Sequence, residues 1–305
     1  MNWVPLEFSS DVTLDDTQRP LEELSNGNIP AIIVRGALDS PACREIANHL
    51  VNEGHLFDPA KPIPDSFLQD SIPEGYFRDG AQEKEWATAQ EALSSHGNKL
   101  RIDIGTSLGY RGSDRNDFFQ RSRESNGLLD RLFEHLNNPV DRLYSALQSL
   151  AVGKTVQTAM ESDGSIYGKA IIRAHYGGYT YKPHFDSVRN RERRSDYAVH
   201  EFDHQFAGVL VLQNAVRNGC SAQCIIHRCF WKPEISPYLA NNTFHLYAEQ
   251  NNIPNVRIDL EPGDLYFFNT GCIHEVPGVD GEQGRIVVAT FIGFSKVADD
   301  VFVWS

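Results

Sequence analysis

The stretch from Arg173 to Ser187 constrains the fold more than any other part of the chain. It is a tyrosine-rich, strand-like run that ends with His184 and Asp186. Residues i and i+2 of an extended chain point to the same side, so this imidazole and this carboxylate are aimed at one point. Alone, a His-x-Asp pair is a weak signal in a chain with eleven histidines, and a hydrogen-bonded strand pair explains it more simply.

A third histidine changes that interpretation. His274 lies on a later predicted strand, after a Pro-Gly-Asp turn and the aromatic run Leu265 to Asn269. Two imidazoles and one carboxylate are the facial triad of non-haem Fe(II) oxygenases. We therefore expect His184, Asp186 and His274 to bind the metal and form the catalytic centre. Such a centre leaves three open positions, two for a chelating 2-oxo acid and one for O2.

Arg285 opens the next apolar strand and supplies the cation that this chemistry needs. A planar guanidinium binds the distal carboxylate of a 2-oxo acid through two parallel hydrogen bonds. The alternatives are a surface position after Gly284 or an ion pair with Glu282. The alternation of Val287 and Ala289 after it favours an interior position.

Composition excludes several classes of protein. The 305 residues carry 28 basic and 41 acidic side chains, a net charge of −13, which argues against a nucleic-acid-binding surface. The chain has no apolar run of about eighteen residues, so no membrane span is predicted, and the N-terminus lacks a signal-peptide pattern.

The number of cysteines is odd, so we expect free thiols and a reducing, cytoplasmic setting. Cys220, Cys224 and Cys229 are spaced unlike any zinc site.

The periodicity of apolar residues changes half-way along the chain. Helical patterns cover residues 40–51, 83–94, 128–136 and 143–150, with Ser40 as the N-cap of the first, and residues 59–80 and 104–123 appear irregular. Strand patterns cover residues 31–36, 169–176, 206–213, 223–230, 256–260, 265–269 and 285–294.

About eight short strands without intervening helices predict a double-stranded β-helix, the cupin-like jelly roll. We therefore expect a mainly β fold with α-helices, in one domain over residues 1–305. Residues 1–165 would be mainly helical support with the first strands, and residues 166–296 the jelly-roll core that carries the metal site.

On these residues, the segment 170–294 resembles the 2-oxoglutarate/Fe(II)-dependent dioxygenase superfamily, in particular its prolyl-hydroxylase-like branch. The upstream half, with residues 104–112, 161–167 and Arg173, resembles the carrier-independent alkaloid halogenases and their freestanding hydroxylase relatives. The resemblance implies Fe(II), 2-oxoglutarate and O2 as cofactor and cosubstrates. It also implies hydroxylation of an unactivated C–H bond with release of succinate and CO2, although desaturation and cyclisation use the same ligands.

The sequence departs from these relatives at two positions. The halogenases have glycine where this chain has Asp186, and the resulting open site takes chloride; here the carboxylate fills it, so hydroxylation is expected. Many relatives also place Ser or Thr two residues after the arginine, where this chain has Val287. The hydroxyl that helps to bind 2-oxoglutarate would then come from Tyr176 or Tyr181.

The substrate is less well defined by the sequence. Arg189 and Arg191 belong to a basic run just after the motif and are candidates to bind an anionic group, although a solvated loop explains the run equally simply. We expect a small metabolite, amino-acid-like, anionic or a natural-product intermediate, as the partner, and no nucleic acid or membrane. Tyr266 and Phe268 either shield the reaction chamber or, more simply, belong to the core.

Three other functions stay open. A cupin-type metalloprotein that does not use 2-oxoglutarate would not need Arg285. A non-catalytic binding module would have little reason to keep all three predicted ligands. A protein-modifying hydroxylase of the same superfamily would need an open groove over residues 187–205.

Overall fold

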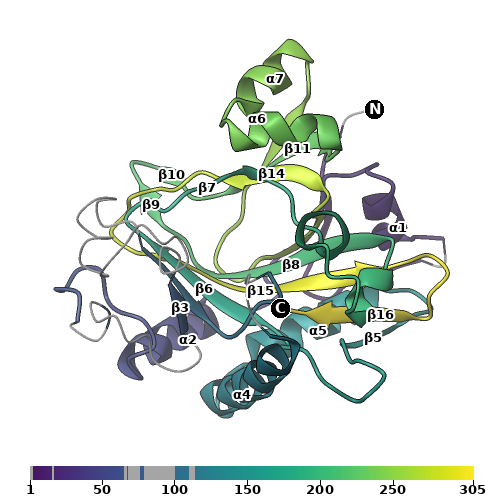
Figure 1. Cartoon of the computed structure of the whole chain (residues 1–305). Helices are drawn as coiled ribbons and strands as arrows, with labels where there is room; N and C mark the ends of the chain where they lie inside the picture. Colours follow the sequence, from purple (N-terminus) through teal and green to yellow (C-terminus); the bar gives the residue numbers. More distant parts are fainter. Residues whose placement is uncertain (1–2, 16, 65–66, 68–75, 79–99, 110–113) are drawn as a thin grey trace.

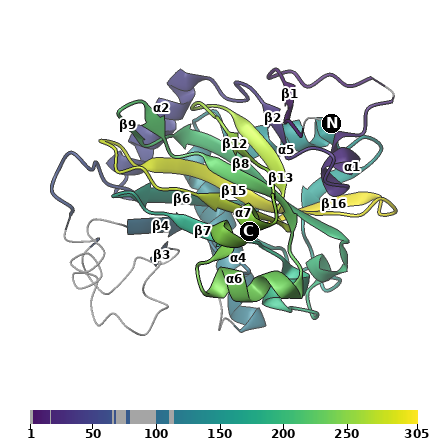
Figure 2. The ribbon, with the colours of Figure 1, turned by 90° about the horizontal axis from the view of Figure 1, so that it is seen from above.

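The computed structural model describes residues 3–15, 17–64, 67, 76–78, 100–109 and 114–305. Two β-sheets face each other, and helices cover the outer side of the larger one (Figure 1). Seen from above, β6, β15 and β8 of the large sheet run side by side (Figure 2).

The large sheet has the strand order β1 (Leu6–Phe8), β2 (Ala31–Val34), β13 (Leu265–Asn269), β8 (His204–Gln213), β15 (Arg285–Phe294), β6 (Ile171–Tyr176), β4 (Leu100–Ile104), β3 (Tyr76–Arg78). At one end β16 (Asp300–Trp304) pairs with β15, and β5 (Thr155–Thr158) pairs with β16. The small sheet has the order β12 (Asn255–Ile258), β11 (Cys224–Phe230), β14 (Cys272–Val276), β7 (Tyr181–His184), and β9 (Val216–Arg217) and β10 (Cys220–Ser221) form a separate hairpin. This arrangement confirms the expected mainly β, jelly-roll fold.

The helices are α1 (Pro20–Ser25), α2 (Ser40–Asn52), α4 (Arg115–Phe133), α5 (Pro139–Leu150), α6 (Ser236–Ala240) and α7 (Phe244–Gln250). Short turns of other helix types are η2 (Val188–Glu192), η3 (Ala198–Glu201) and η4 (Pro233–Ile235). None of the helices in the described ranges is long and apolar enough to cross a membrane.

Strand alternation on the large sheet produces two separate cores. Ile172 and Ala174 of β6 point outward and pack against leucines of α2, α4 and α5. Val287 and Ala289 of β15 point inward and meet Ile226 of the small sheet. Residues of the second set therefore line the space between the two sheets, where the site lies.

Every strand expected from the sequence is present, with ends shifted by a few residues. The observed helices differ from the predicted ones at several positions. Helix α4 begins at Arg115, inside the segment 104–123 that appeared irregular, because the Asp114 side chain accepts hydrogen bonds from the backbone N–H groups of Asn116 and Asp117. The helix expected at 83–94 lies outside the described residues.

Two further corrections concern helix positions. The N-cap of α2 is Asp39 and not Ser40, because the Asp39 carboxylate accepts a 2.7 Å hydrogen bond from the Ala42 amide. Helices α6 and α7 interrupt the second half between β11 and β12, where only strands were expected. Their short apolar segments are too brief to give a helical period.

The Pro-Gly-Asp turn fixes the start of β13 against β2. Asp264 is buried and accepts hydrogen bonds from Arg35 Nη1 at 2.7 Å, the Gly36 amide at 2.9 Å and the Glu261 amide at 3.0 Å. Gly263 before it has φ +101°, and any side chain there would collide with the carbonyl oxygen of Leu38. Removing this carboxylate would take away three hydrogen bonds that join the turn to the end of β2.

We expect Asp264→Ala to lower the free energy of unfolding by about 2 kcal/mol, because three hydrogen bonds to a charged, buried carboxylate are lost. Chemical denaturation of both proteins measures the difference. Asp259→Ala is the matched control, since this aspartate is exposed and, among the described residues, its side chain pairs with Arg257 alone. Equal, sub-kilocalorie effects of the two changes would contradict the assigned role of Asp264.

Candidate metal centre

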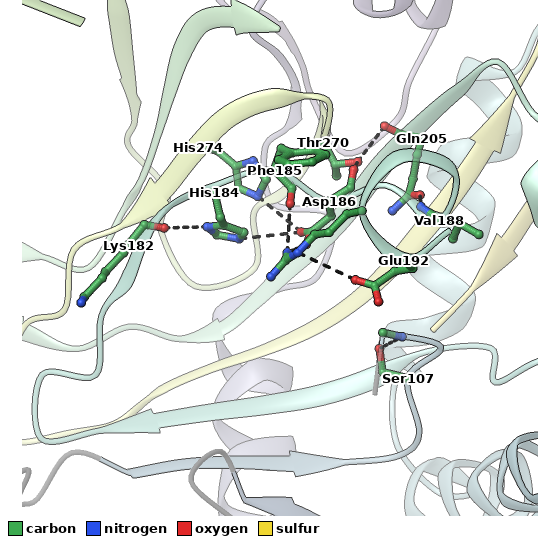
Figure 3. Close-up of polar contacts among 12 residues, drawn as sticks. Ser107, Lys182, His184, Phe185, Asp186, Val188, Glu192, Gln205, Thr270 and His274 are labelled. Atoms are coloured by element: carbon green, nitrogen blue, oxygen red, sulfur yellow. Dashed lines mark hydrogen bonds and ion pairs between the residues drawn. The ribbon is translucent and has the colours of Figure 1, made fainter. Parts of the chain in front are cut away.

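His184, Asp186 and His274 converge in the space between the two sheets. His184 ends β7 and is the cross-strand partner of His274 in β14, which places the centroids of the two rings 4.2 Å apart. The Oδ2 atom of Asp186 lies 3.7 Å from His184 Nε2 and 3.6 Å from His274 Nε2. Figure 3 shows the three side chains pointing toward one another. Their ligand atoms all lie within 4.8 Å of one another, as a metal-binding group requires.

Backbone carbonyl groups fix the orientation of both imidazoles. Nδ1 of His184 lies 2.7 Å from the carbonyl oxygen of Lys182, and Nδ1 of His274 lies 2.9 Å from that of Cys272. Each ring therefore donates its Nδ1 proton to a carbonyl and directs the lone pair of Nε2 toward Asp186. This is the tautomer that a metal-binding histidine needs, and the carbonyls are the outer contacts that hold it.

Asp186 is held on every side. Its backbone N–H donates to the Thr270 carbonyl at 3.0 Å, and the Thr270 hydroxyl donates to the Asp186 carbonyl at 2.9 Å. Its Oδ1 atom accepts a 2.5 Å hydrogen bond from Arg191 Nη1, which also donates to the Phe185 carbonyl. One carboxylate oxygen thus faces the arginine and the other faces the two imidazoles.

The electrostatics suit a cation. Burial, followed by the neighbouring His274 ring, lowers the pKa of His184 to about 4, so this imidazole is neutral at pH 7. Burial alone would raise the pKa of Asp186, but His274, His184 and Arg191 together hold that pKa well below its ordinary range. A neutral imidazole and an ionised carboxylate are the protonation states that bind metal ions.

An inner cavity of about 80 Å³ extends from these residues between the sheets, and Arg285 lines it. The Arg285 side chain is buried; among the described residues its Nε has no hydrogen-bond partner and no carboxylate pairs with its guanidinium. A buried cation without a counter-ion is costly. The carboxylate of a bound 2-oxo acid would provide that counter-ion, so the residues present fit 2-oxoglutarate as well as iron.

The two tyrosines expected near the cosubstrate lie on different faces. Tyr181 lines the cavity, and its hydroxyl lies 3.3 Å from Nε2 of His175. Tyr176 corrects the expectation: it points to the outer core, stacks on Phe57 and donates its hydroxyl hydrogen bond to the Phe57 carbonyl at 3.2 Å. Because Tyr176 follows His175 on the same strand, it must point to the opposite side.

Two residues lie beside Arg285 that were not expected there: Tyr266, named only as a possible shield of the chamber, and His175. Tyr266 lines the same cavity as Arg285, and the guanidinium acts on its phenol group, so its hydroxyl is placed to take the part that Val287 cannot. His175 is buried in the cavity wall, and burial followed by the charge of Arg285 lowers its pKa well below the usual value. His175 shares a strand face with Arg173, and this i, i+2 spacing was the signal available in the sequence.

Tyr266 and Phe268 both line the inner cavity and stack on each other, with centroids 5.4 Å apart. The Phe268 ring also meets the His274 ring edge-on at 4.8 Å. Both side chains thus belong to the core and also line the chamber. The simpler expectation was that they belong to the core alone.

A wider cleft of about 630 Å³ opens from the inner cavity toward the surface. The two share His184, Asp186 and Tyr181. Of the two arginines expected to bind substrate, Arg191 lines the cleft. The expectation that Arg189 binds the substrate is not met. Its guanidinium donates to the carbonyls of His200 and Glu201 and so holds η2 against η3.

Comparison with known proteins gives one match over the full length. The family model described as carrier-protein-independent halogenase WelO5 matches residues 1–305. No curated protein matches the chain.

Solved structures give more distant matches. An N-substituted L-amino acid dioxygenase from Burkholderia ambifaria AMMD has 13% identity and a TM-score of 0.42, with 68% of this chain and 86% of that chain covered. The epimerase SnoN, in complex with Fe3+, alpha ketoglutarate and nogalamycin RO, has 12% identity and a TM-score of 0.43, with 91% and 87% covered. A Pseudomonas putida prolyl-4-hydroxylase has 11% identity and a TM-score of 0.36, with 88% and 94% covered. These scores are too low to carry an argument about function.

We expect Arg191→Ala to weaken Fe(II) affinity about 10- to 100-fold, because Asp186 loses the hydrogen bond that orients it. Anaerobic titration with Fe(II) measures the affinity. Arg193→Asn is the matched control: it removes the same charge at the end of the same turn, asparagine tolerates the φ of 54° there, and Asp186 is not touched. If both variants lose affinity equally, the effect comes from the net charge of the turn and not from this contact.

Proposed function

This chain belongs to the family of the carrier-protein-independent halogenase WelO5, among the Fe(II)- and 2-oxoglutarate-dependent oxygenases, and because Asp186 adds a carboxylate to its two histidines we propose that it is a hydroxylase of a small molecule. Its cofactor and cosubstrates are Fe(II), 2-oxoglutarate and O2. Bound together, they supply the oxidation of an unactivated C–H bond, with release of succinate and CO2.

The carboxylate of Asp186 is the observation that favours hydroxylation over halogenation. Its Oδ2 atom lies within 3.7 Å of both imidazole Nε2 atoms, so the protein itself provides a third ligand beside His184 and His274. The halogenases that the sequence resembles have glycine at this position and use the open site for chloride. With the position filled, oxygen transfer is the outcome that the ligand set favours.

Arg285 and Tyr266 are the residues proposed to bind the distal carboxylate of 2-oxoglutarate. The guanidinium offers paired N–H donors, and the tyrosine hydroxyl stands beside it. Apolar side chains around them exclude water from the chamber and strengthen this ion pair; they include Ile171, Val209, Cys224, Val287 and Ala289. The buried arginine also favours this function over a cupin-type protein that does not use 2-oxoglutarate.

The outer cleft is proposed to bind the substrate. Its volume of about 630 Å³ lies within the usual range for sites of small molecules. Phe291 and Trp304 offer apolar surface, whereas Lys182 and Glu192 offer charge. These side chains favour a freestanding metabolite that has an apolar body and a polar group. Bound in the cleft, it would present one C–H bond to the metal.

The first test is anaerobic addition of Fe(II) and then 2-oxoglutarate, with the weak visible charge-transfer band of the chelate as the readout. We expect the band in the unmodified protein and its loss in His274→Ala. Arg285→Ala should raise the dissociation constant of 2-oxoglutarate about 100-fold, because a buried charge pair is lost. Arg217→Ala, an exposed arginine of β9, serves as the control. Iron binding without the band would refute the use of 2-oxoglutarate.

A second test concerns the choice between oxygen and halide. In turnover with chloride present, the unmodified protein should add only oxygen to its substrate, whereas Asp186→Gly should lose hydroxylation and bind chloride at the opened position. Mass spectrometry of the products distinguishes an added oxygen atom from an added chlorine atom. A chlorinated product from the unmodified protein would show that Asp186 does not block the halide.

A further inference from the structure

A second group of metal-ligating side chains lies on the outer face of the small sheet. His227 belongs to β11, Glu275 to β14 and His245 to α7. Figure 1 shows α6 and α7 together over β11 and β14, on the side away from the large sheet. Because neighbours on a strand point to opposite faces, His274 enters the inner site and Glu275 this outer group. The two groups therefore stand back to back across one strand.

The three side chains converge on one oxygen atom. Oε1 of Glu275 lies 3.0 Å from Nε2 of His227 and 2.8 Å from Nε2 of His245. The ligand atoms all lie within 4.8 Å of one another. His227 is 2% exposed and Glu275 6% exposed, whereas the His245 side chain is 63% exposed. Two ligands are therefore fixed by the sheet, and the third comes from a surface helix.

Packing fixes the ring of His227 in this orientation. Its face meets the Phe244 ring edge-on, with centroids 5.0 Å apart and an interplanar angle of 89°. Phe244 is buried and directly precedes His245 at the start of α7. The contact that orients the first imidazole thus also positions the second.

The proton positions permit metal binding. Nδ1 of His227 is buried and has no hydrogen-bond partner among the described residues. Without a cation, the contact with the Glu275 carboxylate places the ring proton of His227 on Nε2. Because no donor contacts Nδ1 among the described residues, that proton can move to Nδ1 when Nε2 binds a cation. The buried carboxylate of Glu275 supplies negative charge at the same point.

The donor set selects the kind of cation. Two imidazole nitrogens and one carboxylate oxygen suit Zn²⁺ and its neighbours in the transition series, whereas Ca²⁺ and Mg²⁺ prefer oxygen ligands alone. Tetrahedral Zn²⁺ places adjacent N and O ligands about 3.3 Å apart. The observed separations of 2.8 and 3.0 Å need only a small opening, and His245 is exposed and free to move by that amount.

We propose that His227, His245 and Glu275 form a second metal site, for Zn²⁺ or a related divalent transition metal, that joins α7 to the outer face of the small sheet. Water would complete the coordination on the exposed side of His245. The site does not depend on the proposed hydroxylase activity, because no residue is shared with the inner centre.

Counting bound metal tests this proposal. Equilibrium dialysis against Co²⁺, followed by metal analysis, should find one equivalent fewer in His245→Ala than in the unmodified protein, whether or not the inner centre also binds Co²⁺. The unmodified protein should also show the intense visible bands of tetrahedral Co²⁺, and the variant should lack them. Equal stoichiometry and equal spectra in the two proteins would overturn the proposal.

Two controls separate metal binding from damage to the fold. His135→Ala removes another exposed histidine, after α4, and should bind Co²⁺ as the unmodified protein does. His245→Ala should keep the charge-transfer band of the inner centre, since His245 makes no contact with it in the described structure. Zn²⁺ should raise the Tm of the His135→Ala protein and raise that of His245→Ala less. An identical rise in both would count against the site.

Discussion

The pairing of β7 with β14 is the constraint on which the rest of this structure depends. It sets His184 directly opposite His274, with an irregularity in the register between Tyr181 and His184, and Asp186 two residues later reaches the same point. Thr270, just before β14, then binds both the N–H and the carbonyl of Asp186. A slip of one residue would turn His274 outward and Glu275 inward, and both groups of ligands would be lost.

The same alternation organises the large sheet. On β6 and β15, the cross-strand partners His175 and Arg285 both face the cavity, whereas Ala174 and Ile286 face the helices. Among the described residues, the helices of the first half (α1, α2, α4 and α5) therefore do not line the site. They bury the outer side of the strands that carry it, and the energy of that burial keeps a guanidinium in place without a counter-ion from the described residues.

Much of this could be predicted from the sequence, because strand patterns and the His-x-Asp motif are local. The metal ligands and the strands need only alternation and order along the chain. Tyr176 could not be placed, because Gly177 and Gly178 have φ of +60° and +73° and break the alternation that would relate it to His184. Tyr266 could not be assigned either, because its hydroxyl acquires a role only through Arg285, which lies on a strand that is not its neighbour. The outer histidines depend on the docking of α7, a contact between distant segments.

In the proposed function, one carboxylate separates this chain from the chemistry of the halogenases whose family model it matches. Replacing a glycine by an aspartate changes the coordination sphere, but the side chain also needs a hydrogen-bond donor for its second oxygen and a fixed backbone. Arg191 and Thr270 meet those needs here. The proposed change of chemistry would therefore not be carried by position 186 alone: a glycine there would leave Arg191 facing the opened position, where its charge would favour an anion. The arginine that orients a carboxylate in this chain is thus suited, without any other change, to stabilise a halide in its place.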